Sequence, residues 1–540
     1  MRPRDLSRLE SAEFDLLVIG GGIYGLACAY EAASRGLRVA LVDAADLGSG
    51  ASFNHQKTAH GGLRSLGAGH LPGARESIHE RRALARMAPW FLRPLPFLMG
   101  TYRSVLKNRL ALRAAFGLDA WLGRHRNDAV EPELHLPAPR LVSRAATLRL
   151  FPGIREDGLT GGAQWYDYQM VESDRLTLAF AAGADRAGAE IANYAAAFEP
   201  LKDGRRVIGM RVRDALSGRT IAVRARVTLN AAGARAGEVM ALFGVPRPFP
   251  LVKAMNLVTS IPARDMALAA PGRSGRMLTL VPWRGRAIVG TSQSSTLADP
   301  SASGVAAEDL AALIADANHA FPSLHLTAGQ VTLVHRGIVP AAARRGETPE
   351  LRPRPDILDH ATEGVDGAFT VVGVKYTTAR GVAERVAGLV SKRAGRRAAP
   401  SRTARTTLPG AGIADHEALA ITASRTLGVD VPLPAIQHLI RLYAEATPDV
   451  IRVMKERPDL RTPLAPGVST LGAEVVYVIR SEMAMRLTDI VIRRTGLGSS
   501  GRPPADALAA SARSAAAELG WDAARMAEEV GAVESVYEIT

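Results

Sequence analysis

The fold is decided by the stretch FDLLVIGGGIYGLACAYEAASRGLRVALVD, residues 14–43. Its apolar run at 14–20 predicts a buried strand, residues 22–36 predict a helix, and residues 37–43 predict a second strand. Strand, glycine-rich turn, helix and strand together form one βαβ unit. The sequence therefore predicts an α/β fold.

A nucleotide-binding turn joins the first strand to the helix. Gly20, Gly22 and Gly25 form the pattern G-x-G-x-x-G. The first glycine permits the tight turn, the second lets the backbone approach a pyrophosphate, and the third lets the helix pack on the strand. The helix N-terminus adds unpaired amides and a positive dipole for the phosphates. Asp43 ends the next strand, where it would accept hydrogen bonds from a ribose. The pattern predicts a dinucleotide without separating FAD from NAD; a tight turn without a ligand is the alternative.

The composition is that of an ordinary globular protein. A chain of 540 residues exceeds the size of a single core, so two or three domains are expected. With 47% hydrophobic and 22% charged residues, it resembles neither a disordered nor a membrane-spanning protein. The single cysteine, Cys28, excludes an intramolecular disulfide and a multi-cysteine metal site. It fits a reducing compartment such as the cytosol.

The charge balance raises the question of an anionic partner. A net charge of +14 attracts phosphates, nucleic acid and acidic lipid alike. Much of the excess is arginine in an Ala/Arg/Gly-rich sequence, so a biased composition on solvated faces explains it equally well. A flavin-bearing protein that binds nucleic acid would show steeply salt-dependent binding. Because no RNA-binding aromatic motif is visible, nucleic acid is not an expected partner.

The segment after the βαβ unit, DLGSGASFNHQKTAHGGLRSL at 46–66, is rich in Gly, Ser and Asn. Lys57, His60 and Arg64 are interspersed in it. We expect an ordered loop laid against a bound cofactor, with a plain surface loop as the alternative.

Motifs spread along the chain occur in the order of a known family. They are GGGIYG (20–25), DAADLGSGAS (43–52), HGGLR (60–64), NAAG (230–233), VPW (281–283), GTS (290–292), RGIVP (336–340), GVKYTTAR (373–380) and LPG (408–410). Together they resemble the FAD-dependent glycerol-3-phosphate dehydrogenases, which belong to the D-amino-acid-oxidase-like flavoproteins. EMAMRLTDIVIRRTGLG at 482–498 is similar to the helical domain that those dehydrogenases append. The resemblance thus covers nearly the whole chain.

The resemblance implies both an architecture and an activity. The architecture is a Rossmann-type FAD-binding domain, a discontinuous β-rich substrate lobe and a C-terminal helical domain. Such enzymes oxidise the secondary hydroxyl of sn-glycerol 3-phosphate to dihydroxyacetone phosphate, pass a hydride to the flavin and return the electrons to a membrane quinone. The expected partners are therefore a small phosphorylated alcohol, a quinone, the membrane surface and a second copy of the chain. The expected location is the cytoplasm, with peripheral contact at the inner face of the cell membrane.

The expected domain boundaries follow from composition and pattern. Residues 1–408 are one discontinuous catalytic unit, with the FAD core at about 14–90, 160–250 and 335–390 and the substrate lobe at about 91–159 and 251–334. Apolar stretches at 227–229, 277–281, 287–289 and 369–372 are expected strands. Residues 1–14 lack the features of a signal peptide and are expected to form a mobile leader.

The last part of the chain is expected to form a separate unit. Residues 391–412 have six basic residues and almost nothing large and apolar, which predicts an unpacked linker. Residues 413–540 are the expected helical domain. One apolar stripe in it consists of Val476, Ile479, Met483, Leu487 and Ile490, with caps suggested by Thr470 and Gly496.

The resemblance also implies roles for individual residues. The adenosine half of FAD would be held by Gly20, Gly22, Gly25 and Asp43. The pyrophosphate and the isoalloxazine would be lined by Ser52, Lys57, Gly61, Gly62 and Leu63. The adenine side would be contacted by Asn230 and Gly233, and Lys375 and Thr377 would lie beside the ring and the substrate. The expected catalytic set is Arg64, Lys375, His60 and Arg336. Alcohol oxidation needs a proton acceptor near the hydroxyl, and an anionic reduced flavin needs a cation or a helix dipole nearby. His60 and His55 are the candidate bases; the alternative is that each hydrogen-bonds to a loop carbonyl or to FAD.

Several positions depart from the family pattern. They are Val339 in place of an arginine, Ser65 in place of a tyrosine, Gly67 in place of a glutamate, Asn256 in place of a histidine and Val374 in place of a glycine. Arg336 or Arg344 could supply the missing guanidinium. Because several of these positions line the substrate side, a related enzyme acting on another hydroxy or amino substrate is the alternative function.

Residues 93–126 mix Leu, Phe, Tyr102 and Trp121 with many arginines. Such a stretch either lies in the headgroup region of a membrane or packs on the substrate lobe as a helical excursion. No run of 18 uncharged apolar residues occurs, so a membrane span is not expected.

Overall fold

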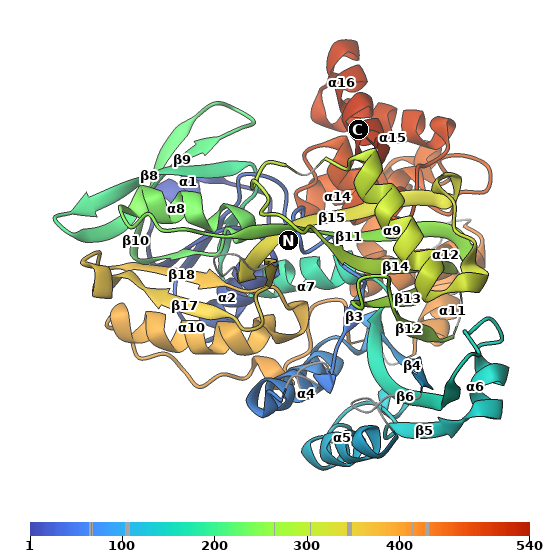
Figure 1. Ribbon diagram of the computed structural model, residues 1–540. Coiled ribbons are helices and arrows are strands. Elements are labelled where there is room, and N and C mark those ends of the chain that lie inside the picture. The colour runs from blue at the N-terminus through green and yellow to red at the C-terminus, as the bar shows by residue number, and fades with distance from the viewer. Residues whose placement is uncertain are drawn as a thin grey trace.

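Two sheets and a C-terminal group of helices make up the molecule (Figure 1). The computed structural model describes residues 1–63, 66, 69–102, 109–263, 265–302, 304–342, 348–412, 415–426 and 431–539. The expected α/β architecture, with a β-rich second lobe and a C-terminal helical domain, is confirmed.

The first sheet is built around the βαβ unit. In spatial order its strands are β17 (Asp356–Asp359), β18 (Ala368–Val372), β10 (Thr220–Asn230), β1 (Glu13–Ile19), β2 (Val39–Val42) and β7 (Glu190–Ala192). β1 pairs in parallel with both β10 and β2, and Leu16 lies opposite Val227 and Val39. These central strands are buried on both faces, which explains their continuous apolar sequences. β8 (Ala195–Asp203) and β9 (Arg206–Asp214) extend the sheet with antiparallel pairing.

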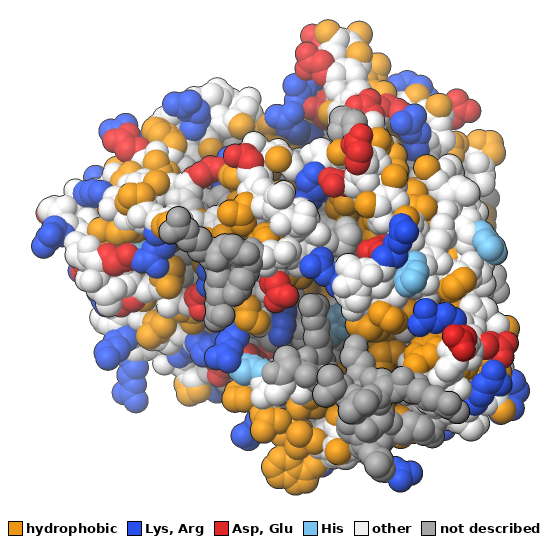
Figure 2. Space-filling model, viewed as in Figure 1, with side chains coloured by type: hydrophobic (Ala, Val, Ile, Leu, Met, Phe, Trp, Pro, Cys, Tyr) orange, Lys and Arg blue, Asp and Glu red, His pale blue; other side chains and the backbone are white. Residues whose placement is uncertain are grey.

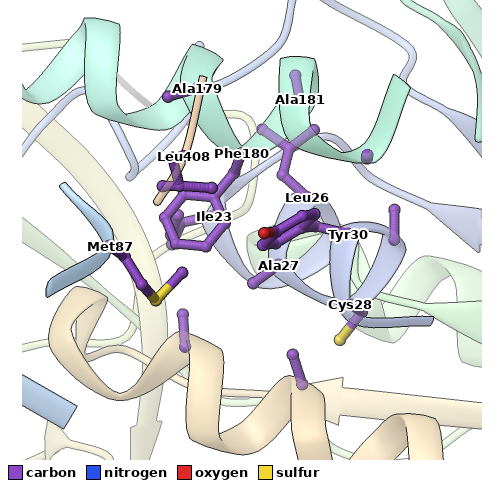
Figure 3. Close-up of a cluster of buried hydrophobic side chains, with 14 of the residues drawn as sticks. Ile23, Leu26, Ala27, Cys28, Tyr30, Met87, Ala179, Phe180, Ala181 and Leu408 are labelled. Carbon is purple, nitrogen blue, oxygen red and sulfur yellow. The ribbon is translucent and has the colours of Figure 1, made fainter. Parts of the chain in front are cut away.

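Helix α2 (Ile23–Ser34) follows the glycine turn and packs between α7 (Ser173–Arg186) and α10 (Ala379–Arg393) (Figure 3). Leu26 is completely buried, and Tyr30 meets Phe180 of α7 edge to face at 6.2 Å between ring centroids. Burying a side chain of this size contributes about 1.5–3 kcal/mol. The packing fixes the axis of α2, and hence the direction in which its N-terminus points.

The second sheet forms the other lobe. In spatial order its strands are β16 (Glu350–Leu351), β15 (Val331–Ala342), β11 (Leu251–Pro262), β14 (Arg286–Gln293), β13 (Met277–Trp283), β12 (Ala267–Pro271), β4 (Leu92–Tyr102), β6 (Leu159–Met170) and β3 (Thr58–Ala59), and β5 (Arg140–Ser143) pairs with β6. Helix α9 (Ala307–Ala320) covers one face through Leu310 and Leu313, which pack with Met255 and Leu257 of β11. The expected strands at 227–229, 277–281, 287–289 and 369–372 are confirmed.

The other α-helices described in the catalytic part lie around the sheets. They are α1 (Leu6–Ser11), α4 (Leu71–Met87), α5 (Arg109–Leu122), α6 (Arg144–Leu150) and α8 (Ala236–Phe243). No helix among the described residues has the length and apolarity needed to cross a bilayer.

The C-terminal domain is helical, as expected. Its helices are α11 (His416–Thr426), α12 (Leu433–Tyr443), α13 (Thr447–Glu456), α14 (Gly472–Glu482), the π-helix η11 (Asp489–Arg494), α15 (Ala505–Leu519) and α16 (Ala523–Glu534). The predicted stripe from Val476 to Ile490 does not lie on one helix. Met483 adopts a left-handed conformation (φ 56°) that ends α14, and the chain starts again at η11. Spacing identified the buried side chains but not this break.

Two segments expected to be unpacked are held in place. The predicted leader carries α1, and Arg2 forms ion pairs with Asp185 and Glu190, both at 2.7 Å. In the predicted linker, α10 continues to Arg393 and Leu408 is 1% exposed. In both cases arginines pair with acidic residues of the core, among them Arg396 with Asp15. Composition alone missed these pairings because the acidic partners lie far away in the sequence.

Candidate functional site

The glycine turn between β1 and α2 has no room for side chains. Gly20 has φ +110°, and a Cβ there would lie 2.6 Å from the carbonyl oxygen of Ala231. A Cβ on Gly25 would overlap the carbonyl oxygen of Gly20. Both positions therefore require glycine, for the reasons that the sequence pattern suggested.

Helix α2 has no side-chain cap from its own N-cap residue. Its N-cap is Gly22, which has no side chain to accept the first amides of the helix. Ser52 lies beside it, and its Oγ accepts a hydrogen bond of 2.9 Å from the amide of Ile23. A cradle of backbone amides at a positive helix end fits the diphosphate of a dinucleotide.

Asp43 braces the glycine turn. Its carboxylate accepts hydrogen bonds from the amides of Gly21 and Ala45. Burial raises the pKa of Asp43 to about 6. A carboxylate has about four acceptor positions, so two amides leave capacity for ribose hydroxyls. The residues present thus fit the adenosine half of FAD.

The His60-Gly61-Gly62 turn is built around Asp167, a buried residue of β6. Asp167 accepts a hydrogen bond of 2.6 Å from the amide of Gly61 and pairs with buried Arg81 of α4. Burial alone would raise the pKa of Asp167, but Arg81 and His60 outweigh it and lower that pKa below its usual value. Sequence reasoning missed Asp167 and Arg81. An aspartate in the middle of an aromatic strand was the available signal, because strands are depleted in this residue.

His60 is held by two side chains. Its Nε2 lies 2.8 Å from Thr58 Oγ1 and its Nδ1 lies 3.4 Å from Asp167 Oδ2. The ring remains 55% exposed. Both nitrogens are thus engaged, which favours the interpretation that the ring supports the loop. In His55, Nδ1 accepts a hydrogen bond of 3.0 Å from the amide of Lys57, and burial lowers the pKa of the ring well below its usual value.

Lys57 lies beneath the loop and is fully buried, whereas the sequence predicted that it lines the cofactor. Its ammonium donates to the carbonyl of Phe53 at 2.6 Å, lies 3.6 Å from Asp174 and sits 4.4 Å from the centroid of the Phe53 ring. Burial lowers the pKa of Lys57 to about 8. The side chain therefore holds the loop from below.

The segment after β18 returns to the same place. The hydroxyl of Tyr24, at the start of α2, donates to the carbonyl of Lys375 at 3.1 Å. Thr377 Oγ1 accepts a hydrogen bond of 3.1 Å from the amide of His60. Helix α10 begins at Ala379, directly after this segment, and its N-terminus adds a second positive dipole. Three segments that are far apart in the sequence, 20–25, 52–63 and 373–377, therefore meet.

Asn230 shapes a turn. Its buried amide donates to the carbonyl of Ala236 at 2.8 Å and to Thr370 Oγ1 at 3.1 Å, and its oxygen accepts from the amide of Ala232. The side chain of Asn230 is thus taken up by this turn, which leads to Gly233 with φ +58°, and the adenine contact stays a prediction.

Val339 and Asn256 stand where the family pattern has an arginine and a histidine. In the continuous pairing of β11 with β15, Val339 lies opposite Val252 and Arg336 lies opposite Met255. Side chains alternate along a strand, so Arg336 and Val339 project to opposite faces of the sheet. Arg336 shares its face with Met255, which packs under α9, and burial lowers the pKa of its guanidinium. The side chain of Arg336 therefore lies on the other face of the sheet from Val339, and its catalytic role stays a prediction.

Some of the other positions singled out in the sequence are described by the structure and some are not. Asn256 is 2% exposed and accepts a hydrogen bond of 2.7 Å from Thr291 Oγ1. Leu63 is half-buried at the end of the HGG turn, where Gly62 has φ +93°. Arg64, Ser65, Gly67 and Arg344 lie outside the described residues, so their predicted roles stay predictions.

A groove of about 880 Å³ runs between α4 and α10, next to the converging segments. The buried ion pair of Glu80 with Arg380 forms part of its wall. Leu71 and Leu122 provide apolar surface at its edge.

Comparisons with known proteins agree with this geometry. Residues 15–389 match the family described as FAD dependent oxidoreductase, and residues 401–526 match the C-terminal domain of alpha-glycerophosphate oxidase. The chain is 31% identical to a glycerol-3-phosphate dehydrogenase of Mycobacterium leprae over 90% of this chain and 81% of that protein. It is 30% identical to one of Synechocystis over 92% of this chain and 90% of that protein. The structure of the glycerol-3-phosphate dehydrogenase from Bacillus halodurans complexed with FAD is similar with a TM-score of 0.76, covering 98% of this chain and 96% of that one at 23% identity.

Proposed function

Because this chain belongs to the family of FAD-dependent glycerol-3-phosphate dehydrogenases, we propose that it oxidises the secondary hydroxyl of sn-glycerol 3-phosphate to dihydroxyacetone phosphate. The observation that carries the proposal is the convergence of segments 20–25, 52–63 and 373–377 on the N-terminus of α2. When bound, FAD supplies the acceptor for the hydride that leaves the alcohol carbon.

The residues of the chain bind and orient the reactants. The amides at the start of α2 take the diphosphate, and Asp43 takes the ribose. Lys375 and the N-terminus of α10 bring positive charge to the place where the reaction develops negative charge. For His60 to accept the proton of the substrate hydroxyl, its Nε2 must exchange Thr58 for the substrate.

Anaerobic bleaching of the bound flavin tests the proposal. The purified protein is mixed under nitrogen with sn-glycerol 3-phosphate, and the visible absorption of the flavin is followed. The enantiomer sn-glycerol 1-phosphate and unphosphorylated glycerol are the matched controls. We expect rapid bleaching by sn-glycerol 3-phosphate alone. A spectrum that stays unchanged with it refutes the proposal.

A second candidate is a related dehydrogenase or oxidase of another hydroxy or amino substrate. Val339 and Asn256 support it, because the first leaves no guanidinium at its position and the second replaces an ionisable ring by an amide bonded to Thr291. Hydroxy acids and amines in the same bleaching assay separate the candidates, because bleaching by one of these compounds and not by glycerol 3-phosphate selects the second.

A membrane quinone is the electron acceptor that we propose, with α5 as the contact to the inner face of the cell membrane. Trp121 of α5 is 62% exposed and Leu118 is also exposed. The guanidinium of Arg124 lies 5.6 Å from the centroid of the Trp121 ring. Tryptophan with arginine at an apolar surface is typical of helices that lie in the headgroup region. Figure 2 shows hydrophobic side chains gathered around α4 and α5, and Leu122 lines the groove described above.

Vesicle binding tests this contact. Trp121→Ser should reduce co-sedimentation with vesicles of anionic phospholipid, while Leu297→Ser, at a leucine of similar exposure (58%) outside α5, should not. Equal binding by both variants and the parent protein contradicts it. The second copy of the chain expected as a partner stays a prediction, which light scattering checks.

A further inference from the structure

Two arginines of the C-terminal domain bind Asp46, which lies in the loop after β2. Asp46 is 1% exposed. Arg494 of η11 binds its carboxylate through two nitrogens, each at 2.8 Å, and Arg493 Nε adds a third contact at 2.8 Å. Burial alone would raise the pKa of Asp46, but the two guanidinium groups outweigh it and lower that pKa to about 2. Asp46 is therefore ionised, and the pairing is charge-assisted and bidentate.

Contacts within the C-terminal domain, and one from Tyr194 of the catalytic part, hold the two arginines in position. Arg493 also binds Asp489 at 2.6 Å, and Asp489 accepts a hydrogen bond of 2.7 Å from Tyr194. Arg494 donates to the carbonyl of Glu482, at the end of α14. Its side chain is fully buried. The π-helix thus presents two largely buried, hydrogen-bonded cations to the catalytic part, and π-helical turns are frequent at functional sites.

The loop that contains Asp46, residues 43–48, also packs against the glycine turn. Gly48 donates its amide to the carbonyl of Gly21 at 2.9 Å, and a Cβ on Gly21 would lie 2.6 Å from Leu47. Asp43 joins the amides of Gly21 and Ala45. Residues 43–48 therefore lie between the place for the adenosine of FAD and the C-terminal domain.

We propose that Arg493 and Arg494 are positioning residues for the cofactor: by holding Asp46 they press the loop 43–48 against the glycine turn and so set the affinity for FAD. The inference rests on the proposed function, since it takes the FAD site as given. It concerns the affinity for the cofactor and is independent of which alcohol is oxidised.

The test measures FAD affinity and folding separately. Arg494→Lys keeps the charge but loses the planar fork. Deflavinated protein is titrated with FAD, whose fluorescence reports binding, and thermal unfolding of the same deflavinated protein gives its stability. We expect the Kd for FAD to rise about tenfold, the equivalent of one charge-assisted hydrogen bond.

Arg175→Lys is the matched control. Arg175 binds Glu482 through two contacts of 2.6 and 2.7 Å, so it is another buried bidentate pair between the catalytic part and the C-terminal domain. It lies on α7 and not on the nucleotide loop. We expect a similar loss of thermal stability with a Kd for FAD that stays within about twofold.

The outcomes are distinct. An unchanged Kd in Arg494→Lys, or an equal rise in Arg175→Lys, overturns the inference. If Arg494→Lys does not fold, Arg493→Lys replaces it, because that variant leaves the bidentate pair intact and should still raise the Kd about threefold. If the unaltered protein does not take up FAD at all, the proposed function fails rather than the inference.

Discussion

At the scale of single residues, Gly61 tests how the HGG turn is built. A Cβ at this position would overlap the guanidinium of Arg81 and displace it from Asp167. Gly61→Ala should therefore leave a buried charge without its partner, at a cost of about 3–5 kcal/mol. Chemical denaturation measures the loss. Gly50→Ala, in the same loop but with open space around its Cα, is the control and should change stability by less than about 1 kcal/mol. Equal effects would contradict this view of the turn.

Asp43 predicts a pH dependence of FAD binding. Burial raises its pKa from 3.8 to about 6, so in the folded protein it becomes protonated as the pH falls below about 6. A protonated carboxyl is a poorer acceptor for the amides of Gly21 and Ala45 and for a ribose. FAD affinity should therefore fall as the pH drops through about 6, and Asp43→Asn should abolish this step.

The stability of the deflavinated protein should change in the opposite direction. Because the pKa of Asp43 is higher in the folded state, its contribution to the free energy of unfolding decreases as the pH rises from 3.8 to about 6. Denaturation of the protein and of Asp43→Asn across this window checks the sign. A contribution from Asp43 that grows with pH would contradict the assignment.

The residues that the sequence identified were those whose role depends on local spacing. Gly20, Gly25 and Asp43 lie where the pattern placed them. Lys57 and Asn230 were recognised as belonging to the site segments, but their side chains turn away into hydrogen bonds with Phe53 and Thr370. The direction of a side chain depends on tertiary neighbours that a linear pattern does not contain.

At the scale of elements, the hydrogen bond that joins α2 to the 373–377 segment can be tested. Tyr24 donates from α2 to the carbonyl of Lys375, and burial raises the pKa of its hydroxyl to about 12. Tyr24→Phe removes this hydrogen bond and should cost about 0.5–1.5 kcal/mol and weaken FAD binding. Tyr102→Phe removes a hydrogen bond to the carbonyl of Arg155 in the other lobe and should leave FAD binding unchanged. Equal FAD affinities in both variants would show that this hydrogen bond does not support FAD binding.

Helices and strands could be predicted where the spacing of apolar residues and the residues of the connecting turns indicated the same structure. The βαβ unit was predicted within a few residues of its bounds. The break at Met483 escaped, because no glycine or proline marks it in the sequence; after it, the amides of Met485 and Arg486 donate to the carboxylate of Asp489.

At the scale of the whole molecule, two kinds of arginine contact should respond differently to salt. The pairs of Arg494 and Arg175 with the catalytic part are buried, whereas Arg124 beside Trp121 faces solvent. Screening weakens exposed charges far more than buried ones. Raising the salt concentration should release the protein from anionic vesicles while its thermal midpoint changes little. A midpoint that falls in parallel with vesicle binding would contradict this distinction.

The assembly of the domains could not be derived from composition. The arginine excess left an anionic partner and solvated faces as alternatives, and neither included the pairs that Arg2, Arg396 and Arg494 form with Asp185, Asp15 and Asp46 across long sequence separations. A motif search finds residues that are close in the sequence, and these pairs become visible in three dimensions only.

The lone thiol of the chain has a practical consequence. Cys28 sits in the helix layer of Figure 3, 1% exposed, and burial raises its pKa, so the reactive thiolate is suppressed. Maleimides should not react with the native protein. A nitroxide or a dye could therefore be attached selectively to a cysteine engineered on the surface. Conversely, the rate of any slow labelling of Cys28 itself would report how often α2 separates transiently from its neighbours.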